Sequence, residues 1–155
     1  MREVFRICKT KYVREAFDGE GAFRFGGRWN SRGTRIVYTT GSLALAALEM
    51  LVHLDDDSLL SAYSFVAAQV PPELILPIEA YRLLPKNWSA SPAPLAIHRI
   101  GDDWAREKAS AVLEVPTAIV PLERNYLLNP SHADFSKIVL GKPQRFAFDE
   151  RLRRK

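Results

Sequence analysis

Segments with strand character and segments with helix character follow one another in this chain without the regular alternation of a doubly wound sheet. Strands are predicted at residues 3–7, 35–39, 62–70, 74–79, 117–120, 137–140 and 145–148. Helices are predicted at 43–54, with Ser42 as the N-cap, and at 102–113, which begins with acidic residues. The longest predicted loops are 9–35, 85–94 and 125–134. This mixed order is typical of an α+β fold.

The chain has 155 residues, which suits one compact domain with one core. We place this domain at residues 1–150, followed by a basic tail at 151–155. No apolar run reaches the ~18 residues that a membrane-spanning helix needs, and the first ten residues lack the apolar stretch of a signal peptide. Cys8 is the only cysteine, so no internal disulfide can form. We therefore expect a cytoplasmic protein without a membrane partner.

The net charge of +4 is unevenly distributed along the chain. Residues 1–35 contain nine basic and four acidic residues, residues 36–150 contain nine and fourteen, and the last five residues contribute +4. Residues 1–150 are therefore neutral overall, which argues against direct nucleic-acid binding. A positive segment at one end of a neutral domain favours a local anion site.

Glycines and an arginine gather in the segment Gly26–Asn30. Glycines let a backbone approach a ligand closely, Arg28 has the geometry to bind a phosphate with two parallel hydrogen bonds, and Trp29 has a face that can cover a flat ring. The alternative is a tight turn with a solvated arginine and a tryptophan in the core. Neither of the standard glycine-rich phosphate-loop motifs is present.

Glu49 is the only acidic residue on the apolar helix predicted at 43–54. A carboxylate at a dry site can stabilise a developing cation, as the cleavage of a ribosyl bond requires. Together with Ser42, Ala46 and His53, it traces one stripe of the helix at steps of three and four residues. The stripe points away from the leucines, and the sequence leaves open whether it faces water or a cleft.

Other polar and aromatic residues stand near these segments. Tyr38, in the strand before the helix, has a ring that can stack on a ligand or that can simply be half-buried in a sheet. A further polar group lies in the predicted loop 125–134 and consists of Asn125, Asn129, Ser131 and His132. The three histidines and the single cysteine lack the spacing of metal ligands, so no metal is expected.

Taken in order, these motifs resemble those of the RES domain family, named for its Arg, Glu and Ser residues. The resemblance runs from about residue 4 to residue 148. It rests on Phe5-Arg6-Ile7, Gly26–Asn30 with Gly33, Tyr38-Thr39, Ala44–His53, Val115-Pro116-Thr117 and Glu123–Pro130 with His132.

This resemblance implies an ADP-ribosyltransferase-like fold, in which a split and mostly antiparallel sheet surrounds a cleft for NAD⁺. It also implies a toxin of a type II toxin–antitoxin system that cleaves the nicotinamide–ribose bond, by hydrolysis or phosphorolysis, and depletes cellular NAD⁺. NAD⁺ is then a substrate. The implied partner is an Xre-like antitoxin with a helix-turn-helix domain, which covers the cleft. The oligomeric state stays open, with a homodimer inside the complex as one alternative.

The resemblance also implies roles for individual residues. Glu49 matches the catalytic glutamate, Arg28 matches the arginine that binds the pyrophosphate or the adjoining ribose, and Tyr38 matches a tyrosine beside the nicotinamide. Residues expected to contact NAD⁺ as well are Arg6, Ile7, Gly27, Trp29 and Asn125.

The family serine is replaced by Thr117, which keeps the hydroxyl but adds a methyl group and stiffens the side chain. Ser131 is the alternative for this role. Three other functions also remain open: a protein-directed ADP-ribosyltransferase, an RNA-binding or ribonuclease toxin, and a non-catalytic interaction module, which the change to Thr117 leaves possible in principle.

Overall fold

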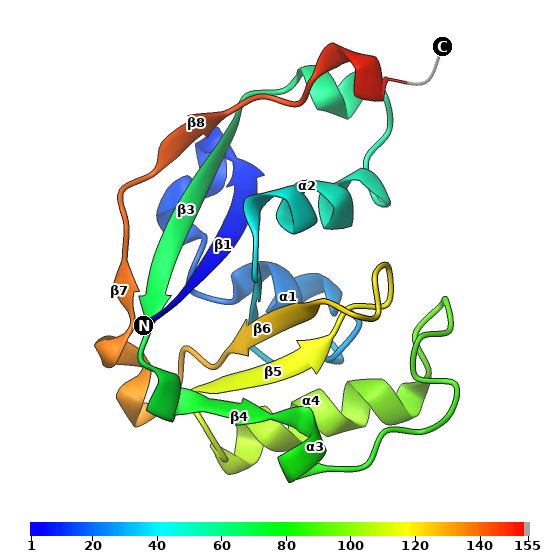
Figure 1. The fold of residues 1–155 in the computed structure, drawn as a ribbon, viewed down its shortest axis with the longest axis vertical. Helices are drawn as coiled ribbons and strands as arrows, with labels where there is room; N and C mark the ends of the chain where they lie inside the picture. Colours follow the sequence, from blue (N-terminus) through cyan, green and yellow to red (C-terminus); the bar gives the residue numbers. More distant parts are fainter. Residues whose placement is uncertain (154–155) are drawn as a thin grey trace.

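The computed structural model describes residues 1–153 and contains one curved, eight-stranded sheet (Figure 1). Its strands lie in the order β4 (Ile75–Pro77), β5 (Val112–Pro116), β6 (Arg124–Leu128), β2 (Val37–Thr40), β1 (Arg2–Lys9), β3 (Tyr63–Val70) and β7 (Val139–Leu140), and β8 (Gln144–Phe146) also pairs with β3. The β4–β5 pair is parallel, and the other pairs in the described part of the chain are antiparallel.

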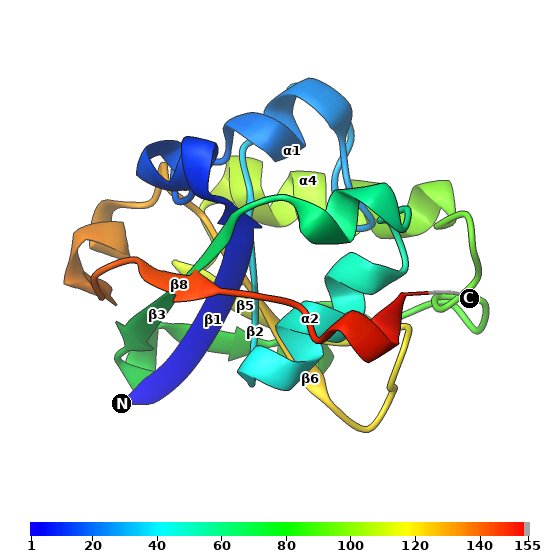
Figure 2. The same cartoon turned by 90° about the horizontal axis from the view of Figure 1, so that it is seen from above.

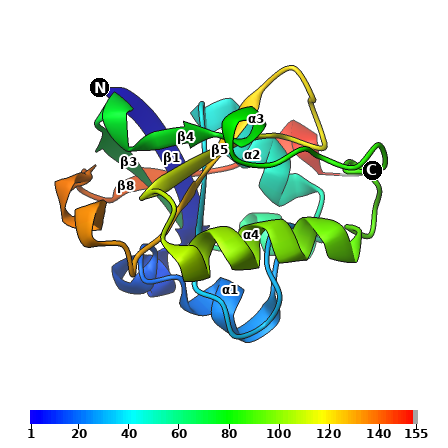
Figure 3. The same cartoon turned by 90° about the horizontal axis from the view of Figure 1, so that it is seen from below.

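The α-helices are short, and short 3₁₀ segments occur between the other elements. The α-helices are α1 (Glu20–Phe25), α2 (Leu43–Leu51), α3 (Ile78–Tyr81) and α4 (Leu95–Glu107). The 3₁₀ segments are Thr10–Glu15, Asp57–Leu60, Pro72–Leu74, Ala133–Lys137 and Glu150–Leu152. Seen from above and from below, α1 and α4 lie side by side, and α2 lies apart from them (Figures 2 and 3).

The sheet is split between β1 and β2. Strand β1 pairs with β3 along its whole length, but it is in register with β2 only at Phe5 and Thr40. Beyond this pair the guanidinium group of Arg6 reaches across the gap, and its Nη1 donates to the carbonyl of Tyr38 at 3.1 Å. Figure 1 shows the consequence: β1 and β3 run at a large angle to β5 and β6. The expected α+β fold with a split, mostly antiparallel sheet is confirmed.

Three clusters of buried side chains stabilise the two halves. The first joins β1, β2, β3 and β6 through Val4, Val37, Ala68 and Leu128. The second packs α4 on β5 and β6, and its largest members are Trp29, Ile97, Trp104, Leu113 and Leu127. The third holds α2 and residue Phe148 against β1 and β3. The opening between the halves therefore sits between separate regions of the core.

Helix α2 follows β2 as the sequence predicts. The hydroxyl of Ser42 accepts a hydrogen bond from the backbone N–H of Leu45 at 3.1 Å, which confirms the N-cap. The helix ends at Leu51 rather than at residue 54, and the turn that follows is closed by the N–H groups of His53 and Leu54, which share the carbonyl of Met50.

The second predicted helix is wrong in position. Helix α4 spans Leu95–Glu107 instead of 102–113, so its acidic residues lie inside the helix and not at its start. Its buried face includes Ile97, Ile100 and Trp104, at steps of three and four residues. Gly101 lies in the middle of α4, where the backbone of Trp29 approaches the helix closely.

Two predictions near the C-terminal half are also wrong. The strand expected at 117–120 is β5, at Val112–Pro116, and the expected loop at 125–134 begins with the central strand β6. Tyr126, Leu127 and Leu128 are fully buried there, so strand pairing outweighs the polar residues on either side. The expected loop at 9–35 contains α1, and the strand expected at 74–79 is only the short β4.

Of the predicted basic tail, residues 151 and 152 complete the last 3₁₀ turn, and residues 154–155 lie outside the described residues. Cys8 lies within β1 and is half-buried, and burial raises the pKa of its thiol. Within residues 1–153, no helix is long and apolar enough to cross a membrane.

Candidate active site

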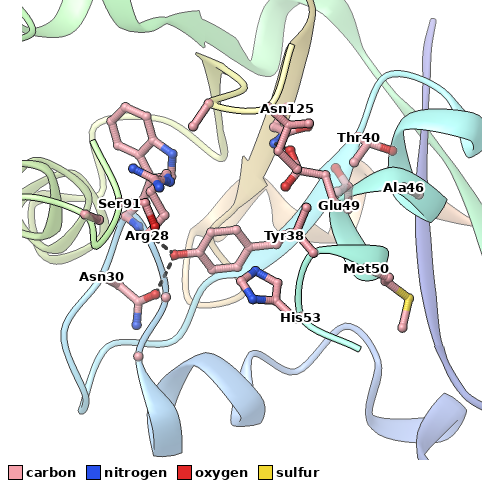
Figure 4. Close-up of a pocket in the computed structure, with 18 of the residues that line it drawn as sticks. Arg28, Asn30, Tyr38, Thr40, Ala46, Glu49, Met50, His53, Ser91 and Asn125 are labelled. Carbon is pink, nitrogen blue, oxygen red and sulfur yellow. Dashed lines mark hydrogen bonds between the residues drawn. The ribbon is translucent and has the colours of Figure 1, made fainter. Parts of the chain in front are cut away.

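A cavity of about 1300 Å³ opens where the sheet splits. This is above the ~300–1,000 Å³ range of most small-molecule sites, so the cavity has room for a ligand as large as a dinucleotide. Its walls come from β1, β2, β6, α2 and the loop that follows α1, and from residues 89–93 before α4. Figure 4 shows side chains that line this cavity.

The polar stripe of α2 faces this cavity. Ala46, Glu49 and His53 all line it, so the side of the helix opposite the leucines faces a cleft. Figure 4 shows Glu49 on the same wall as Asn125, with His53 nearer to Tyr38. Glu49 is the only carboxylate on the described walls of the cavity.

Two donors converge on one oxygen of the Glu49 carboxylate. Thr117 Oγ1 donates to Oε1 at 2.8 Å, and Asn125 Nδ2 donates to the same oxygen at 2.7 Å. The Thr117 hydroxyl also accepts from the N–H groups of Ile119 and Val120, at 3.1 and 3.5 Å, so its proton is directed toward Glu49. The described hydrogen bonds of Glu49 all fall on Oε1, so Oε2 has no protein donor within residues 1–153, and the residue itself lines the cavity.

Thr117 does not itself line the cavity and is 1% exposed. Its hydroxyl therefore holds Glu49 in place, and any effect of Thr117 on a ligand in the cavity would pass through Glu49. Ser131, the alternative for this role, lies beyond the other end of β6, and its N–H bonds to Asn129. The geometry thus places Thr117, and not Ser131, beside the glutamate.

Three arginines on the cavity wall give it positive charge: Arg6, Arg28 and Arg32. Within residues 1–153, none of them forms an ion pair. The Nε atom of Arg6 is buried without a hydrogen-bond partner, and burial lowers the pKa of this guanidinium. A partly desolvated cation without an ion pair is unfavourable, so an anion in the cavity would be stabilised beside Arg6.

Arg28 is held by the loop that precedes α4. Its Nη1 donates to the carbonyl groups of Ala90 at 2.9 Å and Trp88 at 3.3 Å. These neutral acceptors fix the side chain at the wall but leave its charge uncompensated. Arg28 lies across Tyr38 from Glu49 and Asn125 (Figure 4), so the Arg28 guanidinium and the Glu49 carboxylate occupy different sides of the cavity.

Tyr38 lies between these two sides, and its hydroxyl is fully used by the protein. It donates to Asn30 Oδ1 at 2.6 Å and accepts from the N–H of Trp29 at 3.0 Å. Burial is the largest cause that raises the pKa of Tyr38, so the phenol stays neutral. The ring, rather than the hydroxyl, is therefore the part available to a ligand.

The glycine segment supports this tyrosine. A Cβ on Gly27 would lie 2.6 Å from the Tyr38 hydroxyl and 3.0 Å from Asn30 Oδ1, so Gly27 permits close packing inside the protein rather than close approach to a ligand. Gly26 has a φ of 74° and ends α1, a conformation that favours glycine. The segment is thus a scaffold for Arg28 and Tyr38.

Trp29 and Ile7 border the cavity but belong mainly to the core. Trp29 is 2% exposed and packs in the second buried cluster, so the alternative of a core tryptophan describes its position. A Cβ on Gly101 would overlap the carbonyl oxygen of Trp29, which explains why a glycine occurs inside α4. Ile7 is 6% exposed and packs against α2.

Sequence reasoning missed Asn30 as an anchor of the site. This residue is fully buried, and its amide donates to the carbonyl groups of Ala22, Ser31 and Thr34. Its position directly after the glycines could have indicated this role, because asparagine side chains in loops commonly form hydrogen bonds with nearby backbone groups. His98, which lines the cavity from α4, had no signal because the helix was misplaced. No group of three potential metal ligands occurs within residues 1–153.

The fold and the cavity define a class of protein in which a split antiparallel sheet presents one glutamate opposite arginines. The model of the RES domain matches residues 3–149, and the chain belongs to this family. It is 37% identical over 151 residues to "Toxin Res" of Yersinia enterocolitica, covering 97% of this chain and 99% of that protein. It is 39% identical over 155 residues to "Prs ADP-ribosylating toxin" of a Sphingobium species, covering 97% and 96%.

The fold is also similar to that in the crystal structure of the MbcT–MbcA toxin–antitoxin complex of M. tuberculosis. The TM-score is 0.74 at 19% sequence identity, over 94% of this chain and 84% of that one. At this identity the likeness concerns the fold.

Proposed function

We propose that this chain is the toxin of a toxin–antitoxin pair and that it cleaves the bond between nicotinamide and ribose in cytoplasmic NAD⁺. One observation carries the proposal. A single carboxylate, Glu49, is fixed through one oxygen on the wall of a cavity in which Arg6 and Arg28 have no ion-pair partner within residues 1–153. NAD⁺ has a group to match each of these charges. Its pyrophosphate matches the arginines, and its ribose, which becomes cationic when the bond to nicotinamide breaks, matches the carboxylate.

In the proposed reaction, Arg6 and Arg28 bind the pyrophosphate and the Tyr38 ring packs against nicotinamide. The bond between ribose C1′ and the nicotinamide nitrogen breaks, and its electron pair leaves with neutral nicotinamide. Glu49 stabilises the positive charge that grows on the ribose. Water then forms a C1′–O bond and releases a proton, giving ADP-ribose. Phosphate in place of water would give the 1′-phosphate of ADP-ribose.

The experiment that tests this proposal measures nicotinamide release from NAD⁺ by the purified protein, with and without phosphate. We expect Glu49→Gln to lower kcat by about 10²–10³-fold, as when one electrostatic contact to the transition state is lost. The matched control is Glu73→Gln, which changes an exposed glutamate outside the cavity. Equal rates for Glu49→Gln and the parent protein would refute the proposal.

A second candidate function is the transfer of ADP-ribose to a protein. It is favoured by the name of the Sphingobium relative, an ADP-ribosylating toxin. The same cavity chemistry would apply, with a protein side chain in place of water. Mass spectrometry of a bacterial extract incubated with labelled NAD⁺ separates the two functions, since only transfer leaves labelled protein.

The proposed partner is an antitoxin, for which we expect an Xre-like helix-turn-helix protein that covers the cavity. The similar fold in a toxin–antitoxin complex supports a partner of this kind. At the mouth of the cavity, Phe25 and Val52 are 76% and 56% exposed, and large exposed apolar groups are typical of interfaces. Phe25→Ser with Val52→Ser should weaken a co-purified complex without adding negative charge to the cavity proposed for NAD⁺, so nicotinamide release should stay near that of the parent.

A further inference from the structure

The amide of Asn125 has two ends with different surroundings. Its Nδ2 donates to Glu49 Oε1 at 2.7 Å, while its Oδ1 is buried and has no hydrogen-bond partner within residues 1–153. The reverse orientation of the amide would place two acceptor oxygens against each other, so the contact with Glu49 fixes which end is which. Asn125 therefore carries an unsatisfied acceptor at a defined position.

Buried acceptors without a donor are rare and destabilising, and each one calls for an explanation. Asn125 lines the cavity from β6, and water does not reach its Oδ1 in this structure. A ligand hydroxyl is no smaller than water, so it meets this oxygen only after a small shift of the amide, and the cavity that Asn125 lines is where such a donor would come from. Figure 4 shows Asn125 and Glu49 side by side on the same wall, so the same part of the ligand meets both side chains.

We propose that Asn125 is a specificity-determining residue that accepts a hydrogen bond from a ribose hydroxyl next to the bond being cleaved. This inference rests on the proposed function. Asn125 Oδ1 and Glu49 Oε2 have no hydrogen-bond donor within residues 1–153, and two such acceptors match the two hydroxyl donors of an intact ribose. The site thus takes nucleotides with a vicinal diol in the nicotinamide half and discriminates against deoxy sugars.

The same side chain also positions Glu49, and these two roles separate by substitution. Asn125→Ala removes both the donor and the acceptor. Asn125→Asp keeps an acceptor of similar shape but removes the donor to Glu49. Thr117→Val removes the other donor to Glu49 and changes no group on the cavity wall, so it is the matched control for a loosened glutamate.

The experiment compares kcat/KM for NAD⁺ with that for two analogues that lack either the 2′- or the 3′-hydroxyl on the nicotinamide ribose. For one of the two analogues, kcat/KM should fall relative to NAD⁺ by about 5- to 150-fold more in the parent protein than in Asn125→Ala. This is the range expected for a buried acceptor left without its donor. Comparing variants cancels the different intrinsic reactivity of the analogues. Thr117→Val and Asn125→Asp should both keep the discrimination of the parent, although their kcat falls.

Equal losses in the parent and in Asn125→Ala would overturn the inference, and so would a loss of discrimination in Asn125→Asp. The same comparison is made with the nicotinic acid analogue of NAD⁺, which changes the carboxamide. If Asn125→Ala alters discrimination against that analogue rather than against a deoxy analogue, the inference is also overturned. If the parent releases no nicotinamide at all, the proposed function fails. The inference is then decided by calorimetric Kd values for NAD⁺ and the deoxy analogues, compared between the parent and Asn125→Ala.

Discussion

The contact between α4 and the loop that carries Arg28 can be tested at Gly101. A Cβ there would overlap the Trp29 carbonyl oxygen and lie 2.8 Å from its carbonyl carbon, whereas non-bonded atoms normally lie about 3.5–4.0 Å apart. Overpacking costs up to about 3 kcal/mol when backbone meets backbone, and replacing a helix glycine by alanine contributes about 1 kcal/mol of stability. We therefore expect Gly101→Ala to destabilise the protein by about 2 kcal/mol.

This net cost corresponds to a fall in Tm of roughly 4–8 °C for a chain of this size. Gly21→Ala is the matched control, because Gly21 lies in α1 and a Cβ there meets nothing within 4 Å. That variant should gain up to about 1 kcal/mol. Urea unfolding of both variants measures the difference. If Gly101→Ala were as stable as Gly21→Ala, α4 would not pack on the loop as described.

Three further predictions concern the cavity. Thr117→Val should lower kcat about 10- to 100-fold with little change in KM, because Glu49 loses one donor, and Thr117→Ser should restore most of the rate. Tyr38→Phe should destabilise the protein by about 1–3 kcal/mol, measured by urea unfolding, because Asn30 Oδ1 loses its donor, yet it should keep most nicotinamide release. Arg6→Met should raise the Tm of the ligand-free protein, since it removes a desolvated cation, and should raise KM for NAD⁺ about tenfold or more.

The unit formed by β2 and α2 could be predicted because its signals are local. Ser42 caps the helix, and the leucines recur at helical spacing, so the polar stripe with Glu49 follows from periodicity alone. What the stripe faces depends on elements far away in the sequence. Asn125 and Thr117 are 76 and 68 residues from Glu49, and no local pattern reports that distance.

The mistakes near α4 and β6 share one physical cause. Gly101 and its acidic neighbours have low helix propensity or favour caps, but the packing of Ile97 and Trp104 holds the helix together around them. In the same way, Asn125 lies in a central strand because Leu127 and its neighbours are buried. Tertiary packing thus overrides local preference where the local signals are weak.

Two unsatisfied side-chain atoms belong to residues that line the cavity at the split in the sheet. Where β1 leaves β2 after Phe5 and Thr40, the ladder can no longer satisfy the polar groups at the gap, and Arg6 meets only one of them. The orphaned Nε of Arg6 and Oδ1 of Asn125 are then a cost that the ligand-free fold carries. A ligand that satisfies both binds the native state alone and stabilises it. NAD⁺ should therefore raise the Tm of the parent protein more than that of Arg6→Met or Asn125→Ala.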